Sequence, residues 1–217
     1  LSRKQREIRD REQLILDVAL PMLVERGYLG LTMDRIAAAA EYSKGTIYQH
    51  FSCKEEILAA LLVDAMERRT ALYERAATFR GSARERLTAV GMAAELLHHL
   101  YPHQLQAEQV VKAASIRAKT SEQRQQAIGA CELRCMGVIT GLIRDGIASG
   151  DLELPEGFSA EEVCLSLWSL TVGFQVLRGT DVPFGDLGIA DPIATQKTAG
   201  QVLLDGLGWH PLSTEHD

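Results

Sequence analysis

Residues 31–56, LTMDRIAAAAEYSKGTIYQHFSCKEE, constrain the fold of this chain more than any other stretch. Thr32 is a helix N-cap residue, but Arg35 three positions later supplies no carboxylate, so only half of a capping box is present. Apolar side chains then recur at helical spacing, and a run of four alanines leaves a thin face against which a second helix can pack closely. The pattern predicts a short helix followed by a turn at Glu41 to Lys44.

A second short helix is predicted after this turn. Ser43 can cap it, and Gly45 in its first turn has no side chain, so the backbone there can approach another surface closely. Ile47 and Phe51 are four residues apart and are expected to face inward. The side chains left to project are Lys44, Thr46, Tyr48, Gln49 and His50. Such a helix fits the major groove of DNA, with its N-terminal residues toward base edges and its cations toward phosphate.

Weaker interpretations of the same residues stay open. Lys44 to His50 could be a polar, solvated helix face, and Tyr48 could be a packing residue. The ordered pattern favours the DNA interpretation over both. Lys54, at the start of the next helix, is expected to add a phosphate contact.

The distribution of charge agrees with this interpretation, although the formal net charge of the chain is −6. Through Glu56, nine Lys or Arg residues balance nine Asp or Glu residues, whereas the remaining 161 residues hold 14 cations and 20 acids. The first eleven residues carry five cations and two acids. This basic segment predicts a phosphate or minor-groove contact, and the alternative is an ordinary charged, frayed terminus.

Composition indicates a soluble globular protein, because 46% of the 217 residues are hydrophobic, which is enough for a packed core of one domain or two. No apolar run approaches the roughly eighteen residues of a membrane span, and the charged N-terminal segment lacks a signal-peptide core, so a cytoplasmic protein without a membrane partner is expected. The four cysteines are too few and too unevenly spaced for a disulfide framework, so free thiols are expected.

Helical periodicity recurs along the whole chain and predicts an all-α fold of about nine helices. Pro21 is expected to cause a kink or a missing backbone hydrogen bond near Asp17, and Gly27 is expected to end the first helix. The tail after Trp209 is expected to be loose. The expected helices are about 5–26, the two short ones above, a long one from about 54 past 68, one between the break at 80–83 and Pro102, and four at about 103–119, 121–149, 160–178 and 193–207.

The stretch GYLGLTMDRIAAAAEYSKGTIYQHFSCKEEIL resembles the DNA-binding domain of TetR-type (TetR/AcrR) transcriptional regulators. The match combines the Gly-Tyr-x-Gly-x-Thr lead-in, Ser-Lys-Gly-Thr-Ile-Tyr, the His-Phe pair and the Lys-Glu that opens the next helix, in register over about thirty residues. Beyond residue 60 the resemblance is only architectural. Pro21 and Tyr42 depart from the usual pattern, which has an uninterrupted first helix and a small apolar residue before the Ser.

The resemblance implies an N-terminal helix-turn-helix domain of three helices at residues 1–53 and a larger helical domain for ligand binding and dimerisation at 54–217. It implies a homodimer that binds a roughly palindromic operator and is released by a small-molecule effector. Residues that match phosphate-holding positions are Thr32, Tyr48, His50 and Lys54, and those that match positions near bases or phosphate are Lys44, Thr46 and Gln49. Ser43 and Gly45 complete the expected DNA-binding set.

Two other groups of side chains admit a chemical role. Glu95, His99 and His103 have the spacing of metal ligands on a helix, but Pro102 interrupts that helix, so no metal site is expected. Cys131 and Cys135 share a face and, with Cys164, could form a thiol switch or a metal site; their apolar surroundings favour buried core instead.

The sequence therefore predicts a ligand-responsive DNA-binding regulator, most simply a repressor. The last two helices have wide apolar stripes and are expected to form a four-helix interface between two copies. No catalytic constellation or cofactor motif is found, so neither an enzyme nor a cofactor is expected. The alternative is a helical ligand-binding or interaction module that no longer binds DNA. Ligand-binding residues stay unknown, beyond the expectation that a pocket for a mostly apolar ligand includes parts of 87–147.

Overall fold

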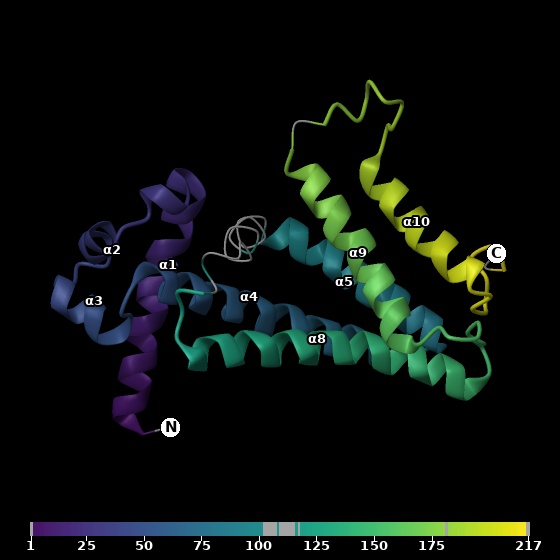
Figure 1. Ribbon diagram of the computed structural model, residues 1–217, viewed down its shortest axis with the longest axis horizontal. Coiled ribbons are helices and arrows are strands. Elements are labelled where there is room, and N and C mark those ends of the chain that lie inside the picture. The colour runs from purple at the N-terminus through teal and green to yellow at the C-terminus, as the bar shows by residue number, and fades with distance from the viewer. Residues whose placement is uncertain (1, 102–107, 109–115, 117, 181, 216–217) are drawn as a thin grey trace. The chain divides into compact units, whose positions relative to one another are not determined.

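The regular structure of the chain is α-helical in all the parts that the computed structural model describes, residues 2–101, 108, 116, 118–180 and 182–215 (Figure 1). Eight helices and no strand are found in these residues, which confirms the predicted all-α class with a helix count near nine. The helix expected at 103–119 falls almost entirely outside the described residues.

The three N-terminal helices are α1 (Arg3–Gly30), α2 (Met33–Ala39) and α3 (Lys44–His50). A full capping box of Ser2 and Gln5 starts α1. The non-helical backbone inside α1 falls at Gly27, with φ 65° and ψ −177°, which is the residue at which the sequence predicts the end of this helix. The helix continues through Pro21, and its non-helical residue lies ten positions after Asp17, near which Pro21 is expected to cause a kink or a missing backbone hydrogen bond.

A continuous hydrophobic core fixes α1, α2 and α3 against α4 (Lys54–Ala76). Ile15, Ile36, Ile47 and Ile57 each have none of their surface exposed and come from the four different helices. Complete burial of such a side chain stabilises a fold by about 1.5–3 kcal/mol. The inward face of α3 therefore belongs to a core that α1, α2 and α4 share.

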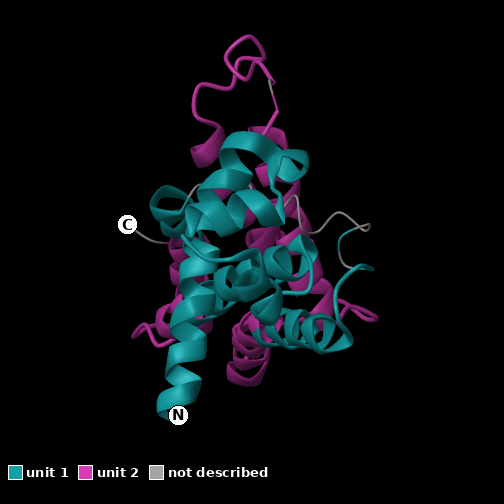
Figure 2. Ribbon diagram, turned by 90° about the vertical axis from the view of Figure 1, so that its left-hand side faces the viewer, with its two compact units in different colours: residues 1–71, 94–134 teal, residues 72–93, 135–217 magenta. Residues whose placement is uncertain are grey.

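The remaining helices are α5 (Ala83–Leu100), α8 (Glu122–Ser149), α9 (Ala160–Arg178) and α10 (Pro192–Gly206). The chain divides into two compact units, residues 1–71 with 94–134 and residues 72–93 with 135–217 (Figure 2). The functional boundary expected between residues 53 and 54 lies inside the first unit and stays a prediction.

Helix α8 is long enough and apolar enough to cross a membrane by length and composition alone. The sequence prediction that no apolar run approaches the length of a membrane span therefore does not hold for α8. Core helices of soluble proteins reach the same length and hydropathy, so these properties of α8 do not by themselves indicate a membrane span.

In the second unit, a buried cation anchors the C-terminal segment. The side chain of Arg84 is 3% exposed and donates hydrogen bonds to the carbonyl oxygen of Trp209, to Gln201 Oε1 at 2.9 Å and to Asp205 Oδ1 at 2.5 Å. Hydrogen bonds from Ser213 and then from Arg84 lower the pKa of Asp205 to about 2. Trp209 itself is fully buried, so the expectation of a loose tail is wrong as far as Ser213.

The four cysteines are free, as predicted. Cys164 is fully buried, and this burial, with smaller contributions from Cys135 and Glu161, raises the pKa of its thiol to about 11. A thiol with so high a pKa is a poor nucleophile at neutral pH. Its position agrees with the core interpretation, and a redox role for Cys131, Cys135 and Cys164 is left without structural support.

Candidate nucleic-acid interface

Side-chain caps set the starts of α2 and α3. Thr32 Oγ1 accepts a hydrogen bond from the backbone N–H of Arg35 at 3.3 Å, and Ser43 Oγ accepts one from the N–H of Thr46 at 3.1 Å. Both caps agree with the sequence prediction, and each is worth about 1 kcal/mol. Because the caps fix where the helices begin, they also fix which residues of α3 face outward.

The turn between α2 and α3 is closed by backbone geometry. Glu41 adopts a left-handed conformation with φ 56°, which is uncommon for residues other than glycine. The N–H of Tyr42 then donates to the carbonyl oxygen of Ala37 at 3.0 Å. Tyr42 is half-buried against the core, so this departure from the usual pattern is accommodated by packing.

One face of α3 is buried and the other is presented to solvent. Ile47 and Phe51 are 0% and 2% exposed, so the predicted inward face is confirmed. Lys44, Gly45, Tyr48 and Gln49 are exposed, with 52% of the Tyr48 surface accessible. The exposed face thus combines a cation, a phenol and an amide on a helix of seven residues. An α-helix with its side chains is about 10–12 Å in diameter, which fits a major groove about 12 Å wide.

Lys44 is paired within the fold. Its Nζ lies 2.7 Å from Asp34 Oδ2 in the first turn of α2, and the two side chains are 64% and 62% exposed. A pair this exposed is weak, contributing about 0.2–1 kcal/mol. Lys44 can therefore exchange its carboxylate partner for a phosphate at small cost.

His50 and Thr46 are less available than the sequence suggests. The His50 side chain is 8% exposed, and its Nδ1 lies 3.5 Å from Glu12 Oε1 on α1. Thr46 is half-buried, with its hydroxyl 2.9 Å from Ser43 Oγ. The structure therefore places His50 toward α1 and Thr46 at the edge of the exposed face.

Lys54 is held against the end of α1. Its Nζ donates to the carbonyl oxygen of Tyr28 at 2.9 Å and lies 3.8 Å from the centre of the Tyr28 ring. The Tyr28 hydroxyl donates to Glu55 Oε1 at 2.5 Å, and this hydrogen bond, followed by burial, raises the Tyr28 pKa. Burial is the largest single influence on the pKa of Glu55 and raises it. Hydrogen bonds, first among them the one from Tyr28, together outweigh burial, so the pKa of Glu55 is lowered. The carboxylate therefore stays ionised beside the phenol.

The sequence does not predict the partners of three residues at this surface. Asp34 pairs with Lys44, Glu12 pairs with His50, and Tyr28 contacts Lys54. Their separations in sequence fit no short helical spacing. The Gly-Tyr lead-in draws attention to Tyr28, but nothing in it identifies a contact with Lys54.

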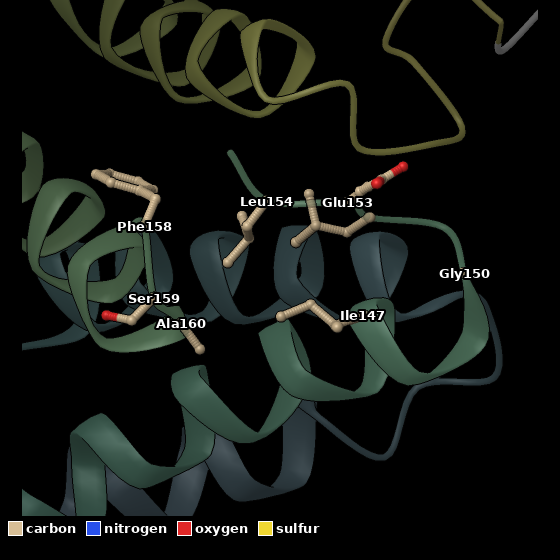
Figure 3. A pocket seen from close by; sticks show the side chains of 8 residues that line it. Ile147, Gly150, Glu153, Leu154, Phe158, Ser159 and Ala160 are labelled. Carbon is tan, nitrogen blue, oxygen red and sulfur yellow. The ribbon is translucent and has the colours of Figure 1, made fainter. Parts of the chain in front are cut away.

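A hollow of about 540 Å³ in the second unit is a candidate for a small ligand. It lies where α8 ends and α9 begins, and Figure 3 shows Ile147 and Leu154 on its floor and wall, with the Glu153 carboxylate directed outward. Its apolar lining fits the expected apolar ligand, but only Ile147 among its lining residues belongs to the 87–147 range expected from the sequence. The pocket expected to include parts of 87–147 stays a prediction, because part of that range falls outside the described residues.

Among the residues that the structure describes, no group of three or more His, Cys, Asp or Glu side chains could hold a metal ion. His99 Nε2 lies 3.4 Å from Glu95 Oε1, and His103 falls outside the described residues. Two of the three residues, Glu95 and His99, thus form an ordinary pair four residues apart on α5.

Residues 15–61 match the family model described as bacterial regulatory proteins of the tetR family. An uncharacterised helix-turn-helix transcriptional regulator of Bacillus subtilis, YhgD, is 30% identical over 148 residues, which cover 66% of this chain and 73% of that protein. The fatty acid metabolism regulator of the same organism is 27% identical over 139 residues, covering 64% and 69%.

A solved structure, FadR of B. subtilis in complex with stearoyl-CoA, superposes with a TM-score of 0.68 over 89% of this chain and 98% of that one. The two sequences are 21% identical, so this similarity supports the fold alone. Together the matches cover the helix-turn-helix and the helical region that follows it.

Proposed function

Because this chain belongs to the TetR family of bacterial regulatory proteins and is a DNA-binding transcriptional regulator, we propose that it represses transcription by binding a roughly palindromic operator as a homodimer. The observation that carries the proposal is the exposed polar face of α3, held by a fully buried Ile47 on its other side. Such a helix can enter the major groove without any change in the core.

Residue roles follow from exposure and chemistry. Tyr48, Lys44 and Lys54 bind phosphates, and Gln49 and Thr46 lie at base edges. The remaining members of the set support these contacts, since Thr32 and Ser43 cap the helices, Gly45 permits close approach and His50 holds the end of α3 beside α1.

An unpartnered apolar stripe on α9 supports the homodimer. Leu165, Trp168 and Val176 are 49%, 43% and 49% exposed and recur at helical spacing. Val202 on the neighbouring α10 is 62% exposed. Two such helices from each of two copies would bury these surfaces in a four-helix interface and set the recognition helices about 34–36 Å apart.

The effector is a mostly apolar small molecule, and long-chain acyl thioesters are the first class to test. A relative regulates fatty acid metabolism, and a structure of the same fold holds stearoyl-CoA. The effector need only prefer a spacing of the recognition helices that does not fit successive major grooves. A cytoplasmic location follows from the DNA partner.

The test uses the full-length protein and a pool of random duplexes, from which bound sequences are recovered and titrated. Tyr48→Ala and Lys54→Ala are expected to weaken binding to every duplex, whereas Thr46→Ala alters the preferred sequence. Arg80→Ala, an exposed cation between α4 and α5, is the control and should change neither. Lack of salt-sensitive retention on any duplex would support an interaction module that no longer binds DNA.

A further inference from the structure

A tyrosine near the end of α1 holds the lysine that opens α4. Gly27, with φ 65°, turns the chain there, and the fully buried Leu31 fixes the far side of the turn. Tyr28 in this turn lies against Lys54 and Glu55, the first two residues of α4. We propose that Tyr28 is a positioning residue for DNA binding, which presents the Lys54 ammonium group to phosphate and keeps the Glu55 carboxylate from neutralising it. The inference rests on the phosphate contact proposed above for Lys54.

Tyr28 gives Lys54 two neutral partners. The ammonium group donates to the Tyr28 carbonyl oxygen at 2.9 Å and lies 3.8 Å from the centre of the Tyr28 ring. Neither partner carries a negative charge, and Lys54 is only half-buried, so the ammonium keeps its full charge for an external anion. A phosphate that approaches Lys54 therefore replaces neutral contacts, whereas at Lys44 it replaces the carboxylate of Asp34.

The hydroxyl of the same tyrosine holds the carboxylate of Glu55. It donates to Glu55 Oε1 at 2.5 Å, and Glu55 is 9% exposed, so water is a poor substitute for this donor. Lys54 and Glu55 thus contact the ring face and the hydroxyl of one residue, and within the described structure they form no ion pair with each other. The other hydrogen bonds to Glu55 come from its own backbone and from Cys53 and are uncharged. A carboxylate released by the phenol is therefore drawn to the neighbouring ammonium.

This arrangement lies at the junction between the recognition helix and α4. Lys54 follows His50, the last residue of α3, by four positions, and Phe51 between them is 2% exposed. The buried Phe51 fixes the connection, so the ammonium has a defined place relative to α3. Phosphate contacts set the register of a helix on DNA and carry no sequence information directly. The effect of Tyr28 should therefore be the same on all duplexes.

The test removes the hydroxyl alone. Tyr28→Phe keeps the ring over Lys54 but releases Glu55 into a weak ion pair, so affinity should fall by about 1.4- to 5-fold per protomer, or about 2- to 30-fold for a dimer. The probe is a fluorescent duplex selected by the unaltered protein, with a scrambled duplex beside it, and the loss should be equal on both. Tyr101→Phe is the matched control, because Arg68 Cζ lies 5.7 Å from the centre of the Tyr101 ring, and it should leave the affinity unchanged.

Removal of the carboxylate separates this role from a structural one. Tyr28→Phe/Glu55→Gln should regain at least the affinity of the unaltered protein, because no carboxylate remains to pair with Lys54. A residue that only stabilised the domain would give a double variant at least as weak as Tyr28→Phe. In a Lys54→Gln background, Tyr28→Phe should have no effect on affinity. Circular dichroism of each variant checks that the helices are kept.

Three results would overturn the positioning role while the proposed function stands. They are an unchanged affinity in Tyr28→Phe, no recovery in Tyr28→Phe/Glu55→Gln, and a loss that persists in the Lys54→Gln background. If Lys54→Gln alone leaves the affinity unchanged, the phosphate contact of Lys54 falls with the inference, but the contacts of α3 do not. Failure of the unaltered protein to bind any duplex would overturn the proposed function as well.

Discussion

Replacement of Asp34 by asparagine should strengthen DNA binding while weakening the fold slightly. Asp34 holds the ammonium group of Lys44 at 2.7 Å, with both side chains more than 60% exposed. Phosphate binding by Lys44 must give up this pair, whose contribution is about 0.2–1 kcal/mol. Its removal should therefore raise affinity by about 1.4- to 5-fold per protomer, and by about 2- to 30-fold for a dimer.

The same substitution removes a carboxylate from the first turn of α2, where the helix dipole favours a negative charge. The free energy of unfolding should consequently fall by about 0.5–2 kcal/mol. The two effects have opposite signs, so general damage to the domain cannot imitate them.

Fluorescence anisotropy with a selected duplex measures the affinity, and urea unfolding measures the stability. Asp64→Asn is the matched control, because Asp64 pairs with Arg68 on α4, away from α3, and its loss should leave the affinity unchanged. In the double variant Asp34→Asn/Lys44→Gln the gain should disappear. Weaker binding by Asp34→Asn alone would refute the assignment of Lys44 to phosphate.

Three further substitutions test the second unit. Trp168→Asp would place a charge in the proposed dimer interface and should raise the dimer dissociation constant by at least about 100-fold in sedimentation velocity. Leu29→Asp is the control, because Leu29 is 85% exposed on α1, and it should leave the dissociation constant unchanged. Gly146→Ala would place a Cβ 2.7 Å from the Trp209 ring and should cost about 1–3 kcal/mol in urea unfolding. The pKa of Asp205 is lowered from 3.8 to about 2, so the ionised carboxylate stabilises the fold fully above about pH 4 and loses this effect as the pH falls to about 2. The difference in unfolding free energy between the unaltered protein and Asp205→Asn should therefore disappear between about pH 4 and pH 2 in acid unfolding curves.

Local features of the interface could be predicted from the sequence, and long-range pairs could not. Caps at Thr32 and Ser43 act over three residues, and the inward direction of Ile47 follows from helical periodicity. The partners of Lys44 and Lys54 lie 10 and 26 residues away and depend on how the helices pack.

The anchored tail escapes prediction for the same reason. Its sequence is short and mixed, and nothing local predicts that Trp209 would be buried. The carbonyl oxygen of Trp209 accepts a hydrogen bond from Arg84, which is 125 residues away on α5. A lone cation in an amphipathic helix is usually solvated, so the buried position of Arg84 becomes evident only from the packing of α5 against the C-terminal segment.

An acidic chain that binds DNA must rely on contacts that do not depend on net charge. Lys44 and Lys54 are already partnered, so each phosphate contact that they make replaces an internal interaction and adds less net affinity than a contact from an unpartnered cation would. Release of counterions from the DNA still accompanies each contact, so the salt dependence should be steeper than the affinity alone suggests. Under the proposed residue roles, discrimination between sequences falls to uncharged groups on α3, chiefly Gln49 and Thr46, because a base edge is read by hydrogen bonds whose strength salt changes little.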